Sequence, residues 1–166
     1  WIIVVSATIT ALINFLINLG VIIVFALANG VTPRLTWLLV PFVVLELYLL
    51  SLGIAFFLGA INVKFRDISS IWEVFMQALF YAIPIIYPIT MVAAASPSAA
   101  KIFLLNPIAQ VIQDVRFLLI TDQTITTWNY LPERFFHFIP LIIVLFILAL
   151  GGVYFRKRSK YFAEEA

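Results

Sequence analysis

The 166-residue sequence contains no cysteine, and it has only two methionines and one histidine, His137. A chain without cysteine forms neither a disulfide framework nor a thiolate metal site, so cysteine use indicates nothing about its redox compartment. Charged residues are also scarce, at 11%, and the formal net charge is +2. Because nucleic-acid binding requires a strongly basic surface, so small an excess predicts no nucleic-acid partner.

The chain also lacks the short motifs of nucleotide-binding and hydrolytic enzymes. It has no G-x-x-x-x-G-K-[ST] loop to cradle phosphates, no H-E-x-x-H, no glycine-rich dinucleotide loop and no G-x-S-x-G. We therefore predict no catalytic, cofactor-binding or metal-binding residue on this chain. If its function consumes ATP, another polypeptide must hydrolyse the nucleotide.

Hydrophobic residues, in contrast, make up 64% of the chain, against roughly 45–50% in soluble domains. They occur in runs of about 20 residues, long enough to cross a hydrocarbon core about 30 Å thick. Lipid cannot satisfy an open backbone, so the runs should be helices. The predicted fold is an all-α polytopic membrane bundle, a single transmembrane domain with spans at 2–28, 35–61, 71–92 and 135–155. Trp1 opens inside an apolar run without a charged leader, so we expect a fragment.

One predicted connection, 93–134, is too long for a simple turn. Within it, 106–120 is semi-apolar at helical spacing, with Asn106 as a helix cap and Pro107 at the first helical position. Fifteen residues reach only about 22 Å. We expect a re-entrant or interfacial helix here, preceded by a loop containing Ser96, Pro97 and Ser98, and not a fifth span.

Basic residues near the span ends predict the orientation. The loop 62–70 and the tail 156–166 hold a dense basic set, whereas basic residues on the opposite side are spread along a longer length. The positive-inside rule therefore places 62–70 and 156–166 in the cytoplasm and 93–134 outside. The basic set comprises Lys64, Arg66, Arg156, Lys157, Arg158 and Lys160.

Polar residues recur at helical spacing inside two of the predicted spans. In the first span, Asn14 and Asn18 continue a row that begins with Ser6 and Thr10. Such rows either hold helices together through hydrogen bonds, each worth about 0.6 kcal/mol, or line a polar path. The third span has a similar row, formed by Glu73, Gln77 and Tyr81.

Glu46 lies near the middle of the second span, where an unpaired charge costs about 2.5 kcal/mol or more. Its side chain must therefore face protein or a watered cavity. Two interpretations remain open: a protonated carboxyl bonded to a neighbouring helix, or a role in substrate passage or conformational coupling. His137, near the outer end of the last span, is interpreted as an interfacial residue.

Pro84 and Pro88 lie one turn apart at the outer end of the third span, close to Tyr81 and Tyr87. Each proline removes a backbone donor, so a kink or break is predicted there. The freed carbonyls need partners that lipid cannot supply.

The helix predicted at 106–120 is the nearest element with suitable polar groups. The polar residues that offer donors and acceptors to the proline break are Gln110, Gln113, Asp114 and Arg116. We predict that the break and this helix together close the outer end of a path, either as a moving gate or as a static cap.

Three stretches together resemble a known family. They are NVKFRDISSIW from Asn62, LFYAIPIIYPITMV from Leu79 and LLNPIAQVIQDVR from Leu104. In this order and spacing they resemble the ABC-2 type permeases that export cell-surface polysaccharides, such as O-antigen, teichoic acid and capsule. The likeness covers most of the chain and looks like the last four of the family's six spans.

The resemblance implies a homodimeric permease in the bacterial plasma membrane, surrounded by lipid. Two cytoplasmic ATP-binding subunits would hold the ATP and Mg, and the dimer would pass a lipid-linked glycan outward. It also implies that the cytoplasmic loop couples to the ATPase through Asn62, Lys64, Phe65, Arg66 and Asp67. For the last two residues simpler roles stay open: Arg66 anchoring the topology and Asp67 capping the next helix.

Two other classes of function remain open. A drug or lipid exporter of the same fold would share the whole topology. A membrane-embedded glycan polymerase or ligase would need clustered catalytic residues outside the membrane, whereas 93–134 offers only scattered charges.

Overall fold

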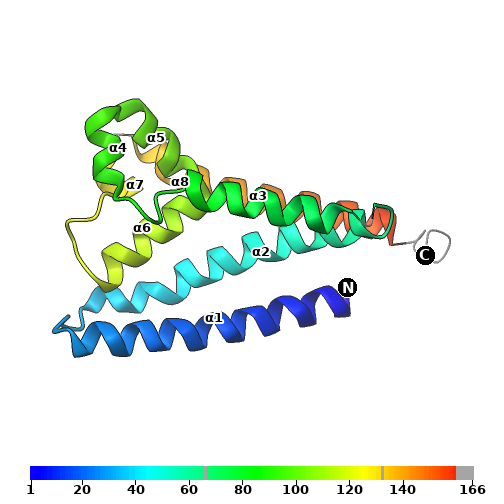
Figure 1. Cartoon of the computed structure of the whole chain (residues 1–166), viewed down its shortest axis with the longest axis horizontal. Coiled ribbons are helices and arrows are strands. Elements are labelled where there is room, and N and C mark those ends of the chain that lie inside the picture. The colour runs from blue at the N-terminus through cyan, green and yellow to red at the C-terminus, as the bar shows by residue number, and fades with distance from the viewer. Residues whose placement is uncertain (66, 132, 160–166) are drawn as a thin grey trace.

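The computed structural model describes residues 1–65, 67–131 and 133–159 (Figure 1). This part of the chain is helical and contains no β-strand, which confirms the predicted all-α fold. The elements are α1 (Ile2–Ala28), the 3-10 helix η1 (Leu35–Leu39), α2 (Val40–Asn62), α3 (Ile68–Ala82), α4 (Ile89–Ala95), α5 (Pro97–Leu105), α6 (Pro107–Leu119), α7 (Thr127–Tyr130) and α8 (Arg134–Arg158).

Three helical segments of the described chain are long and apolar enough to cross a membrane by themselves. They are α1, the η1–α2 segment Leu35–Asn62, and α8. Their bounds coincide closely with the spans predicted at 2–28, 35–61 and 135–155. Many of their large apolar side chains, most of those on α1 among them, are exposed on the single chain, as lipid-facing or partner-facing surfaces require.

The predicted third span, 71–92, is interrupted in the structure. Helix α3 ends at Ala82, and α4 starts only at Ile89. Pro84 and Pro88 lie in the irregular segment between them, so the break expected from the two prolines is confirmed. At 15 residues, α3 alone extends about 22 Å, and its crossing of the membrane stays a prediction.

The segment before 106–120 differs from the expected loop. Helix α5 begins at Pro97, and the Ser96 hydroxyl caps it by accepting a 3.4 Å hydrogen bond from the Ala99 amide. Helices α5 and α6 then meet at a bend of 96°. The Ser96-Pro97 pair is a standard helix start, so the sequence contained this signal.

Helix α6 forms where the sequence predicts it. Pro107 occupies its first turn, and the Asn106 side chain accepts a 3.0 Å hydrogen bond from the Ile108 amide. This bond satisfies one of the free donors at the helix start.

Replacing Asn106 by alanine should lower the free energy of unfolding by about 1 kcal/mol, because the cap is lost. Hydrogen exchange at the first turn of α6 should rise, whereas exchange in α8 should stay unchanged. Asn106→Asp, which keeps the accepting oxygen, serves as the control. An equal loss in both variants would show that the side-chain acceptor is not what stabilises the helix start.

A glycine contact joins α2 to α8. A Cβ built on Gly53 would lie 2.7 Å from the Leu148 Cα, and one built on Gly151 would overlap the Gly53 carbonyl oxygen. Small residues allow such close approach of spans in membranes, where tight packing and not water drives helix association. This crossing fixes the two helices that frame the site described below.

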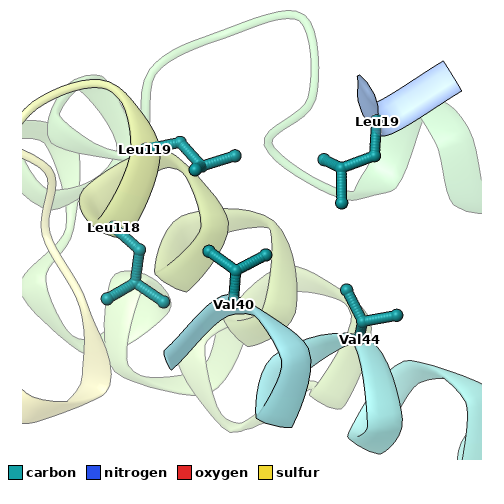
Figure 2. Close-up of a cluster of buried hydrophobic side chains, with 5 residues drawn as sticks. All are labelled: Leu19, Val40, Val44, Leu118 and Leu119. Atoms are coloured by element: carbon teal, nitrogen blue, oxygen red, sulfur yellow. The ribbon is translucent and has the colours of Figure 1, made fainter. Parts of the chain in front are cut away.

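The two ends of the molecule differ. Figure 1 shows the start of α1, the end of α8 and the junction of α2 and α3 at one end, and α4, α5 and α7 near the other, towards which α6 also points. A cluster of Leu19, Val40, Val44, Leu118 and Leu119 fastens α1, α2 and α6 together at that second end (Figure 2). There, the Thr36 hydroxyl also donates to the Leu118 carbonyl at 3.1 Å. The structure thus separates the loop 62–70 from 93–134, as the predicted topology requires.

Candidate functional site

A cleft of about 620 Å³ opens between α2, α6 and α8, with α7 on one wall. Most of its lining is apolar or aromatic, which is the usual character of ligand sites. The polar and aromatic residues that matter chemically are Phe42, Glu46, Gln110, Asp114, Trp128 and His137.

Three of these residues form a hydrogen-bonded group inside the cleft. The Gln110 amide nitrogen donates to the Asp114 carboxyl, one helical turn further along α6. The Glu46 carboxyl, on α2, also bonds to the Gln110 side chain. Gln110 and Asp114 are buried, with 7% and 8% of their surface exposed. Glu46 thus meets both expectations, since it faces protein and also lines a cavity; a role in passage stays a prediction.

His137 forms part of the opposite wall. Its Nε2 lies 3.0 Å from the Leu131 carbonyl oxygen, and its ring lies 4.5 Å from the Trp128 ring. The side chain is half-buried, so it is a cleft residue as well as one near a helix end. No pattern in the sequence indicates that Trp128 lies beside His137.

The proline break is held by α6 through a single side chain. The Arg116 guanidinium donates to the Pro84 carbonyl at 3.2 Å and to the Ile85 carbonyl at 2.7 Å. The Tyr87 hydroxyl donates to the Ala82 carbonyl at 2.9 Å, which bridges the break locally. The predicted pairing of the break with α6 is therefore present in the structure.

The α6 side chains that contact the proline break are fewer than expected. Gln110 and Asp114 lie at the cleft and bond to each other, so they do not supply the break as predicted. Only Arg116 does so, because it projects from another face of α6. Tyr81 is 69% exposed and lies outside the cleft.

The other predicted path-lining residues lie apart from the cleft. Asn14 and Asn18 are exposed on α1, where the Asn18 amide donates to the Asn14 carbonyl at 2.8 Å. Glu73 and Gln77 are exposed on α3. The structure does not bring either pair to Glu46, and their role in a path stays a prediction.

The turn between α2 and α3 is shorter than the nine residues expected, because Asn62 ends α2 and Ile68 starts α3. Lys64, Phe65 and Asp67 are exposed there, and the Lys64 ammonium lies 5.4 Å from the Phe65 ring centre. The Asp67 side chain makes no capping hydrogen bond to α3, so the capping role considered for it is absent. Arg66 lies outside the described residues.

These features define a multi-pass integral membrane protein built from helices. Its relatives give the class more closely. The chain is similar to the O-antigen export system permease protein RfbA of Myxococcus xanthus, with 28% identity over 159 residues, which are 96% of this chain and 58% of that protein. Two Klebsiella pneumoniae proteins of the same name are 27% and 28% identical, each over 92% of this chain and 55% of its own length.

These matches confirm the resemblance to polysaccharide-exporting permeases that the three sequence stretches indicate. No family model matches the chain. The chain spans little more than half the length of these relatives, at 55–58%.

Proposed function

We propose that this chain is part of the permease subunit of an ABC transporter that exports a lipid-linked cell-surface polysaccharide of the O-antigen type. The observation that carries the proposal is the match to three O-antigen export permeases over 92–96% of the chain. The relatives are named as permeases, which supports a transport role and not an enzymatic one.

The partner in this proposal is a separate ATP-binding subunit, which holds the ATP and Mg, and the permease itself is a homodimer. The exposed side chains of Asn62, Lys64, Phe65 and Asp67 support docking at the α2–α3 turn, because no contact within the described chain covers them. Only residues 63–67 lie between α2 and α3, so a force applied at this turn would reach both helices through a short connection.

The predicted outer gate has a physical basis in this structure. Lipid cannot supply hydrogen bonds to the backbone carbonyls exposed where α3 ends before α4. The Arg116 side chain donates hydrogen bonds to two of them, the carbonyls of Pro84 and Ile85. If Arg116 releases them, the α3–α4 connection can move while α2 and α8 stay packed. The break and α6 therefore form the proposed exit closure.

Deletion of the gene in its host tests the function. Surface glycan should disappear while lipid-linked glycan accumulates inside, and the intact gene with its ATPase should restore export. A catalytically dead ATPase is the matched control and should restore nothing. Unchanged surface glycan together with new sensitivity to a drug would contradict the proposal and favour the drug-exporter alternative.

The topology is tested with cysteines introduced at Ser69 and Ser98. A membrane-impermeant maleimide should label Ser98→Cys in intact cells and Ser69→Cys only after lysis, because the two positions lie on opposite sides of the predicted bilayer. The 166 residues contain no cysteine, so they contribute no background labelling. Equal labelling of both in intact cells would contradict the orientation.

The coupling turn is tested with Arg66→Lys and Asp67→Asn. Arg66→Lys keeps the charge but loses the planar fork, and Asp67→Asn keeps the shape but loses the charge. We expect export and permease-stimulated ATP hydrolysis to fall about tenfold, with the permease still inserted at wild-type levels. Lys160→Arg, in the basic tail, is the control. Normal export and normal ATPase stimulation in both variants would remove the coupling role.

A further inference from the structure

The cleft between α2, α6 and α8 has hydrogen-bond acceptors without matching donors. The Gln110 amide nitrogen is already engaged with Asp114 and Glu46. Its Oε1 is buried and has no hydrogen-bond partner in the described part of the protein. Gln110 as a whole is only 7% exposed. Each carboxyl keeps further acceptor capacity, since a carboxylate has about four lone-pair sites.

His137 adds a fourth acceptor to the same cleft. A carbonyl oxygen can only accept, so Nε2 must donate to Leu131. In the neutral ring, Nδ1 is then an acceptor, and it is buried without a partner among the described residues. Unpaired buried polar atoms are costly, so they indicate that something else binds there.

The residues around these atoms indicate which charge a ligand of the cleft would carry. No Lys or Arg is among the described residues that line the cleft, and Arg116 is engaged with the proline break. Thr126 and Asn129 contribute the other polar groups, a hydroxyl and an amide, on the α7 side. An anion would meet two carboxyls with no cation to offset them, whereas a cation would be neutralised.

The residues at the opening of the cleft indicate the character of the uncharged part of the ligand. Phe42, Leu45 and Phe138 line the cleft and are 69%, 52% and 51% exposed. The exposed ring of Trp128 stands beside His137. Aromatic faces attract cations, and apolar rims in a membrane protein favour a hydrocarbon body.

We infer that this cleft binds the primary ammonium group of an amphiphile, with the ammonium among Glu46, Asp114 and Gln110 and the apolar body on the Phe42 and Phe138 rim. A primary ammonium has three donors and no acceptor, which suits an acceptor-rich group better than a hydroxyl that also accepts. The inference does not depend on the proposed export function. Two sources offer this chemistry: an aminophospholipid of the bilayer, and an amino sugar of a lipid-linked glycan.

The test uses the whole protein in phosphatidylcholine nanodiscs and measures binding of decylamine by calorimetry. Decylamine should bind at least about tenfold more tightly than decyltrimethylammonium, which has a charge but no N–H donor, and than decanol. Equal binding of all three would overturn the inference. This comparison needs no variant, so it does not depend on the folding of any mutant.

Variants then locate the site. Glu46→Gln and Asp114→Asn should each weaken decylamine binding about tenfold, because each removes a charged acceptor and keeps the shape. Glu73→Gln, an exposed acid on α3 away from the cleft, is the matched control and should bind as the wild type does. Equal weakening by all three, or by none, would overturn the placement.

Competition distinguishes the sources. Phosphatidylethanolamine added to the nanodisc should displace decylamine if the bilayer supplies the amine, and octyl glucosaminide should do so if an amino sugar does. N-acetylated octyl glucosaminide, which lacks the ammonium, is the control for the sugar. Failure of both amines to compete would overturn the inference.

Discussion

Gly151→Ala is expected to lower the free energy of unfolding by about 3 kcal/mol, the upper end of the cost of overpacking. The added methyl group would overlap the Gly53 carbonyl oxygen, which is backbone and cannot rotate away. The α2 and α8 helices must therefore separate, and their packing along the crossing is lost. Equilibrium unfolding of the purified protein in mixed micelles measures the change.

Gly152→Ala is the matched control, because it adds the same methyl group one residue further along α8. Nothing lies within 4 Å of the Cβ it would create. Alanine also favours helix over glycine, so this variant should be as stable as the wild type or more stable by up to about 1 kcal/mol. Equal destabilisation by both variants would show that the Gly53 contact is not the cause, because helix propensity favours alanine at both positions.

Arg116→Met is expected to release the proline break from α6. The variant removes two hydrogen bonds from a charged donor, each worth about 1.5–3 kcal/mol, and leaves the Pro84 and Ile85 carbonyls without it. Ile83, at the start of the break, is only 2% exposed. A cysteine placed at Ile83 should react with maleimide at least about tenfold faster when Arg116 is also methionine.

Arg134→Met controls for loss of an arginine near the same end of the molecule, since Arg134 is exposed at the start of α8. It should leave the reactivity of the Ile83→Cys background unchanged. Arg116→Lys keeps the charge but loses the fork that reaches two carbonyls, so an intermediate rate is expected. An unchanged rate in Arg116→Met would show that the break is held by other contacts.

Local patterns along the chain were sufficient to predict the long helices and α6. The length of the apolar runs predicted four spans, because the thickness of the bilayer fixes the length a span needs, and three of these spans coincide with single long helices. The prolines at 84 and 88 predicted the break, and Asn106 with Pro107 predicted the start of α6, because each acts on its own backbone. Helix α5 had the same kind of local signal at Ser96 and Pro97, which was interpreted as a loop.

The sequence by itself also determined that the Glu46 side chain needs protein or water around it. It determined as well that the backbone carbonyls at the Pro84–Pro88 break need hydrogen-bond donors. Only the tertiary structure decided which residues meet these needs. Gln110, Asp114 and Arg116 are close together on one short helix, yet they serve two different places because its faces point in different directions. The rotation of α6 against α2 sets those directions, and the packing of Leu118 against Val40 holds the two helices in that arrangement. Such contacts join residues far apart in the chain, so no local pattern encodes them.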